Sequence, residues 1–254
     1  MHMFRARFAR DVVTEFLPSA RVRKVQRAFV LCDGMPSIPR KQELAEFLAA
    51  KGYWVFYPRY RGSWESGGKF LERSPHLDIL DVVDGMGREF RETAFGRQFR
   101  VTADEVFVIG GSFGGTAALL CSLDSRVKKV VANCPVVDWA ILGNEQKKET
   151  SNPSYTAYIR AAFGEGYRLS ARNWEKLKDG KFYSPLFHAK EIDPAKVMMF
   201  HAKDDPYVPY RTVQKFARQT GARLKLFKRG GHLSTDWIVR KYWKEIAEFF
   251  ETDV

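Results

Sequence analysis

The sequence predicts an α/β fold in a single domain, residues 1–254, with a mostly parallel central sheet and helices on both of its faces. Short apolar runs alternate along the chain with amphipathic segments of helical period, which is the order of strands and crossover helices in a parallel sheet. Most runs are continuous rather than alternating, as expected for strands buried on both faces. With 45% hydrophobic and 28% charged residues, a chain of 254 residues suffices for one well-packed core.

Each element follows from this pattern. The apolar runs predict strands at residues 28–32, 53–57, 106–109, 127–132, 197–200 and 224–227. The amphipathic segments predict helices over residues 41–51, 78–90, 116–123 and 211–220, and a last helix over 237–250 whose core contacts include Trp237 and Trp243. Residues 138–192 contain aromatics at helical spacing and several turn signals but no strand-like run. We expect this interval to form a small helical cap inserted over the site.

Composition and cysteine usage narrow the functional classes. No apolar stretch reaches the roughly 18 residues of a membrane span, and the arginines among residues 1–10 are not typical of a secretory signal. Cys32, Cys121 and Cys134 lie in apolar contexts and cannot all pair, which favours small buried side chains in a reducing compartment. The sequence therefore predicts a cytoplasmic protein.

The net charge of +12 favours anionic partners through its long-range field. The basic residues are spread, however, and no repeat interleaves them with aromatics that could stack on bases. Nucleic acid is therefore not an expected partner, and a solvated basic surface is the simplest interpretation. Contact with an anionic substrate or a membrane headgroup stays open, and the sequence does not indicate an oligomeric state.

A glycine-flanked serine directly follows the run at residues 106–109 and opens a helix-compatible stretch. The motif reads Gly110-Gly111-Ser112-Phe113-Gly114-Gly115. Small neighbours permit the sharp strand-to-helix turn that exposes a nucleophilic hydroxyl. The turn also places the N–H of Phe113 at a helix N-terminus, where it stabilises a developing oxyanion. A phosphate-binding loop is the alternative, but the motif lacks the lysine such a loop needs.

A carboxylate and a histidine follow the last two runs. Asp204 and Asp205 compete to orient the base, and Pro206, which fixes the backbone after Asp205, favours Asp205. His232 follows two glycines and is the expected base, because it completes the chain order serine, acid, histidine. The other histidines occupy positions where a structural role is more common: His2 at a terminus expected to fray, His76, His188 and His201.

The end of the first run supplies a second candidate oxyanion donor. Asp33-Gly34-Met35-Pro36 follows residues 28–32, and Gly34 lets the backbone turn so that the N–H of Met35 faces the serine. A plain turn at this place is the alternative.

With these residues in view, the chain resembles the catalytic domain of prolyl oligopeptidase-type enzymes, in the acylaminoacyl-peptidase and dipeptidyl-peptidase branch of the α/β-hydrolase superfamily. The resemblance runs from about residue 26 to the end. It implies the α/β-hydrolase fold, a triad of Ser112, Asp205 and His232, and an oxyanion hole at Phe113 and near Met35. Besides the serine motif, it is carried by Pro58-Arg-Tyr-Arg-Gly-Ser63, Pro135-Val-Val-Asp-Trp139, Tyr183-Ser-Pro-Leu-Phe-His188 and Asp205-Pro-Tyr-Val-Pro209.

Two departures bear on the substrate. Peptidases of that group usually carry a β-propeller before the hydrolase, for which this chain leaves no room, and their oxyanion loop commonly reads His-Gly-Gly-Pro. We therefore expect a serine hydrolase that cleaves a small-molecule carboxylic ester, a thioester or an amide through an acyl-enzyme, with no metal or organic cofactor needed. A peptidase acting on short peptides and a non-catalytic hydrolase-fold binding protein are the alternatives.

Overall fold

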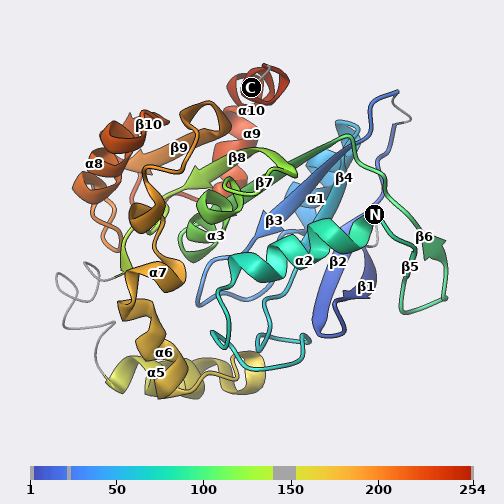
Figure 1. Ribbon diagram of the computed structural model, residues 1–254, viewed down its shortest axis with the longest axis horizontal. Helices are drawn as coiled ribbons and strands as arrows, with labels where there is room; N and C mark the ends of the chain where they lie inside the picture. Colours follow the sequence, from blue (N-terminus) through green and yellow to red (C-terminus); the bar gives the residue numbers. More distant parts are fainter. Residues whose placement is uncertain (1–2, 22–23, 140–152, 253–254) are drawn as a thin grey trace.

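The computed structural model describes residues 3–21, 24–139 and 153–252 and is built around one eight-stranded sheet (Figure 1). The strands are β1 (Phe4–Phe8), β2 (Val12–Leu17), β3 (Arg27–Cys32), β4 (Trp54–Pro58), β7 (Glu105–Gly111), β8 (Val127–Asn133), β9 (Val197–Ala202) and β10 (Arg223–Phe227). Their order is β1-β2-β4-β3-β7-β8-β9-β10, and every pair from β4 to β10 is parallel. The predicted mostly parallel sheet is therefore confirmed.

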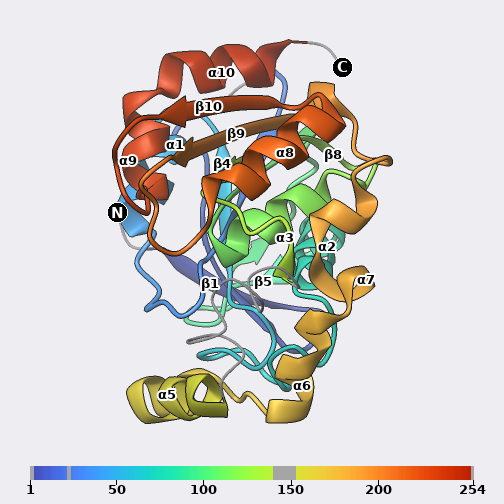
Figure 2. The same ribbon diagram turned by 90° about the vertical axis from the view of Figure 1, so that its left-hand side faces the viewer.

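Helices cover both faces of this sheet, as predicted (Figure 2). One face carries α1 (Gln42–Ala50), α9 (Thr235–Lys241) and α10 (Trp243–Glu251). The other carries α2 (His76–Met86), α3 (Phe113–Cys121) and α8 (Tyr210–Thr220). A small second sheet pairs β5 (Phe90–Arg91) with β6 (Gln98–Phe99). No helix in the described part of the chain combines the length and apolar character needed to cross a bilayer.

The central strand β7 shows why the apolar runs become strands buried on two sides. Successive side chains of a strand point to opposite faces. Val106 and Val108 accordingly belong to the core under α2 and α3, whereas Phe107 and Ile109 belong to the core under α1 and α10. The ring of Phe107 lies 4.5 Å from that of Phe250, so the C-terminal helix closes over the middle of the sheet.

Two parts of the fold differ from the prediction. Residues 3–21 contain β1 and β2, an antiparallel pair absent from the predicted strands; its phenylalanines pack with Phe56 and Phe90, so tertiary contacts order this end. His2 itself lies outside the described residues. The predicted last helix is two helices that meet at Tyr242, and Trp237 is 43% exposed rather than part of the core. Strand β10 is only half-buried because it lies at the edge of the sheet.

The interval predicted as a cap, residues 138–192, is described from residue 153 onward and at residues 138–139. It contains α5 (Pro153–Phe163), α6 (Ala171–Glu175) and α7 (Gly180–Tyr183), joined by 3₁₀ turns. Isolated bridges from Ser63 to Tyr167 and from Phe70 to Leu169 attach it to the segment after β4. Residues 140–152 lie outside the described part, and a cap over the site remains a prediction.

A buried lysine joins β8 to the end of α10 and gives a test of this packing. Lys129 is 1% exposed, and its Nζ donates to the carbonyls of Phe249 (2.7 Å) and Thr252 (2.8 Å). We expect Lys129→Met to lower the free energy of unfolding by about 1–3 kcal/mol, because buried acceptors lose their donor. The exposed Lys244→Met on α10 should change it by less than about 0.5 kcal/mol. Urea denaturation measures both, and equal effects would contradict this role.

Candidate active site

The chain is strained at Ser112, between β7 and α3. Its backbone has φ 56° and ψ −120°, a left-handed conformation that costs a non-glycine residue about 1–3 kcal/mol. The N–H of Ser112 donates to the carbonyl of Asn133 at 2.9 Å, which ties the turn to the end of β8. Helix α3 begins at the next residue, Phe113, whose N–H has no acceptor within the helix. This is the geometry predicted for a nucleophile with an oxyanion donor beside it.

The glycines around Ser112 allow two other loops to approach its turn. A Cβ on Gly114 would lie 2.5 Å from the carbonyl oxygen of Asp33, on the loop after β3. A Cβ on Gly111 would lie 2.1 Å from Oγ1 of Thr235, which begins α9 just after the histidine loop. Both distances are far shorter than real Cβ contacts. Because Gly111 and Gly114 have no side chains, the loop after β3 and the start of α9 can both approach the serine turn at the same edge of the sheet.

A hydrogen bond joins Asp205 and His232 at this edge of the sheet. The Nδ1 atom of His232 lies 2.8 Å from Oδ2 of Asp205; the aspartate side chain is 0% exposed and the histidine side chain 26%. Oδ1 of Asp205 accepts the N–H groups of Tyr207 (2.9 Å) and Val208 (3.0 Å). Burial alone would raise the pKa of Asp205, but the hydrogen bonds from His232 and Val208 outweigh it and lower that pKa below its ordinary value. The acid is therefore a charged, fixed acceptor.

The neighbouring Asp204 has a different partner. Its Oδ1 accepts the N–H of Gly231 at 2.9 Å, one residue before the histidine. The two aspartates therefore have different partners. Asp205 is hydrogen-bonded to the imidazole of His232, and Asp204 is hydrogen-bonded to the loop that carries this histidine. Of the two carboxylates weighed from the sequence, only Asp205 is placed against the ring.

The loop after β3 lies beside the serine. A Cβ on Gly34 would lie 3.8 Å from the Cβ of Ser112. Asp33 organises the loop, since its Oδ1 accepts the N–H of Gly34 at 3.0 Å and its Oδ2 accepts the hydroxyl of Tyr57 at 2.5 Å. Burial and the nearby carboxylate raise the pKa of Tyr57, which keeps it a hydrogen-bond donor. Among the described residues, the N–H of Met35 has no protein acceptor and remains available for a ligand.

Asn133 is a site residue that the sequence reasoning missed. It is 1% exposed; its carbonyl accepts the N–H of Ser112, and its Nδ2 donates to the carbonyl of Leu233 at 2.6 Å. One side chain and its backbone therefore connect the serine turn to the residue after His232. The sequence does contain a signal for it: a polar residue at the carboxyl end of an apolar run, which indicates a position at the site edge of the sheet.

The other described histidines have local partners of their own. His76 starts α2, bonds Oγ of Ser74, and burial lowers its pKa to about 4. His188 pairs with Glu191 at 3.0 Å. His201 is buried in β9 close to Asp205.

The glycine contacts give a direct test. We expect Gly114→Ala to lower the free energy of unfolding by about 1–3 kcal/mol, because its Cβ would meet main-chain atoms of Cys32 and Asp33. The same shift would displace the serine turn and reduce ester hydrolysis by up to about a hundredfold. Gly87→Ala, at φ −73° with no atom within 4 Å of its added Cβ, is the matched control and should be neutral or slightly stabilising. Indistinguishable denaturation curves and rates for the two variants would refute the close-approach argument.

Comparison with known proteins identifies the family of the chain. The model of the prolyl oligopeptidase family matches residues 40–252, which include Ser112, Asp205 and His232. No curated protein sequence is significantly similar. Among solved structures, an esterase of Pyrococcus furiosus superposes with a TM-score of 0.67 at 17% identity, covering 98% of this chain and 90% of the esterase.

Two further structures mark the range of similar proteins. Acylaminoacyl peptidase of Pyrococcus horikoshii gives a TM-score of 0.66 at 19% identity, and this chain corresponds to 41% of its length. Est1E of Butyrivibrio proteoclasticus gives 0.66 at 12% identity, with 99% of this chain and 100% of Est1E covered. The chain therefore belongs to the prolyl oligopeptidase family and is a serine hydrolase with the α/β-hydrolase fold.

Proposed function

We propose that Ser112, His232 and Asp205 form a catalytic triad that hydrolyses a carboxylic ester or thioester of a small molecule. The observation that carries this proposal is the 2.8 Å bond from the imidazole of His232 to the fully buried Asp205. The carboxylate can only accept, so Nδ1 carries the proton and Nε2 is left as the base. The strained Ser112 lies at the same carboxyl edge of the parallel strands, which favours it as the group that Nε2 deprotonates.

The reaction follows from these roles. Nε2 of His232 takes the hydroxyl proton as Ser112 attacks the acyl carbon, and a tetrahedral intermediate forms. The N–H groups of Phe113 and Met35 then stabilise its oxyanion. The imidazolium, stabilised by Asp205, protonates the leaving group, and water repeats the cycle on the acyl-enzyme. Because both N–H groups are held by packed backbone, they need no reorganisation as charge develops, and losing one such donor costs about 10²–10³ in turnover.

Peptide hydrolysis is the second candidate. The family match and the superposition on acylaminoacyl peptidase favour it, whereas the esterase superposition and the Asp33-Gly34-Met35-Pro36 loop favour esters. Comparing short acyl nitrophenyl esters with aminoacyl nitroanilides separates the two. In either case the described part of the predicted cap, residues 153–192, would limit the size of the acyl group; the hydroxyl of Tyr183 on α7 donates to the carbonyl of Phe113 at 2.8 Å. The three free, buried cysteines support a cytoplasmic location.

The nucleophile is tested by labelling. We expect Ser112→Ala to abolish both reaction with a fluorophosphonate probe and hydrolysis of nitrophenyl acetate, because the attacking oxygen is removed. Ser19→Ala, in the loop that follows β2, is the control and should label as the unmodified protein does. Mass spectrometry of the labelled peptide identifies the serine. A label on another serine, retained in Ser112→Ala, would overturn the assignment.

The two aspartates make a matched pair. Asp205→Asn should reduce turnover by about 10⁴, because the amide favours the wrong tautomer of His232 and cannot stabilise its charged form. Asp204→Asn keeps an oxygen that can accept the N–H of Gly231, so we expect a change of less than about tenfold. Steady-state kinetics with one ester, beside near-ultraviolet circular dichroism to confirm folding, measures both. A larger loss in Asp204→Asn than in Asp205→Asn would reverse their roles.

A further inference from the structure

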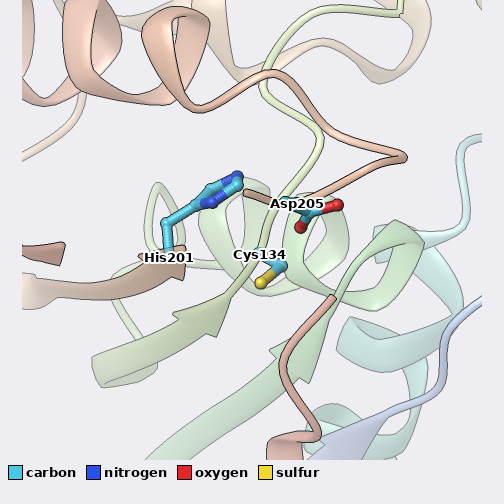
Figure 3. Close-up of side chains that lie close together, drawn as sticks. All are labelled: Cys134, His201 and Asp205. Atoms are coloured by element: carbon cyan, nitrogen blue, oxygen red, sulfur yellow. The ribbon is translucent and has the colours of Figure 1, made fainter. Parts of the chain in front are cut away.

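A second group of side chains adjoins the carboxylate of Asp205. Cys134, directly after β8, and His201, in β9, each place a potential ligand atom near Asp205, and the three ligand atoms lie within 4.8 Å of one another. Figure 3 shows the imidazole of His201 extending from its strand toward Asp205, with the sulfur of Cys134 close by. The N–H of Cys134 donates to the carbonyl of Phe200 at 2.8 Å, so strand pairing fixes the cysteine next to the histidine.

The imidazole of His201 carries an unused lone pair. The ring is 0% exposed, and its Nδ1 lies 2.9 Å from the carbonyl of Ala202. A carbonyl only accepts, so Nδ1 must hold the proton. Burial lowers the pKa of His201, which keeps the ring neutral and leaves Nε2 as an acceptor. Nε2 is buried and has no hydrogen-bond partner. A histidine whose other ring N–H donates to a backbone carbonyl is the usual form of a metal-binding histidine.

The thiol of Cys134 supplies a soft ligand. It is fully buried, and burial together with the charge of Asp205 raises its pKa, so the metal-free site holds the thiol form. A thiolate, a neutral imidazole and a carboxylate are ligands that Zn²⁺ accepts together, with a fourth position for water. Mg²⁺ and Ca²⁺ prefer oxygen ligands and would discriminate against this set.

We propose that Cys134, His201 and Asp205 form a binding site for Zn²⁺ and that occupation of this site inhibits the enzyme. Binding replaces the S–H bond with a sulfur–zinc bond and releases one proton, with no change of oxidation state. The ion is an inhibitor and not a cofactor of the hydrolysis.

Inhibition follows from the shared carboxylate and rests on the proposed triad. Asp205 stabilises the imidazolium that His232 becomes during the reaction. A divalent cation on the same carboxylate neutralises that charge and repels the imidazolium. The ion also competes for the carboxylate oxygens of Asp205, which accept hydrogen bonds from His232, Tyr207 and Val208.

Binding is measured first, without reference to activity. The 254-residue chain with Ser112→Ala, freed of metal with a chelator, is titrated with Zn²⁺ against a chromophoric zinc indicator, and with Co²⁺ to detect thiolate-to-metal charge-transfer absorption. We expect one ion per chain and a thiolate band. Cys134→Ser and His201→Gln should each weaken binding at least tenfold, whereas Cys121→Ser, which changes another buried free cysteine, should not. Circular dichroism and thermal unfolding verify that each variant is folded.

Activity is measured second. Zn²⁺ should inhibit ester hydrolysis by the unmodified chain, EDTA should restore it, and the inhibition constant should rise at least tenfold in Cys134→Ser relative to that variant's own metal-free rate. Equal zinc affinity in Cys134→Ser and Cys121→Ser, or no thiolate band, would overturn the site. Zinc bound through Cys134 without inhibition would uphold the site and overturn its inhibitory role, whereas the triad itself is tested by Asp205→Asn. Loss of all hydrolysis in metal-free protein would refute the inhibitory role.

Discussion

The close approach of the β7–α3 turn to its neighbours is the constraint on which the candidate site depends. Ser112 holds a backbone conformation that a non-glycine residue adopts only when its surroundings enforce it. Here the enforcement is steric and polar: the turn packs against main-chain atoms of Cys32 and Asp33, and its N–H is bonded to Asn133. These contacts hold the loop after β3 and the serine turn against the ends of the central strands β3 and β8.

The packing of the site also supplies the hydrogen bonds that its buried carboxylates need. A carboxylate with no exposed surface is stable only when its oxygens are occupied, and Asp205 has an imidazole and two backbone N–H groups around it. Asp33 likewise accepts hydrogen bonds, from the phenol of Tyr57 and from the N–H of Gly34. Two buried acids therefore act in different ways: one orients a base, and the other shapes a loop.

The surroundings of Asp205 carry the proposed link between zinc binding and hydrolysis. Its carboxylate lies against His232 on one side and near Cys134 and His201 on another. The lone pair on Nε2 of His201 is unsatisfied in the protein alone, and an orphaned buried acceptor of this kind is costly. In the proposed site, zinc would satisfy this lone pair and would compete with the proposed triad for the carboxylate of Asp205.

Elements with local signals can be predicted from the amino-acid sequence. Continuous apolar runs predict the parallel strands, and small residues around Ser112 predict a turn that only they permit. Pro206 after Asp205 singles out one aspartate, which the structure then places against His232. Other features depend on contacts between strands far apart in the chain. They are the packing that orders β1 and β2, the bridging role of Asn133, and the proximity of Cys134 to His201. Strand register sets such neighbours, and register follows from the packing of the whole sheet, so no local spacing encodes it.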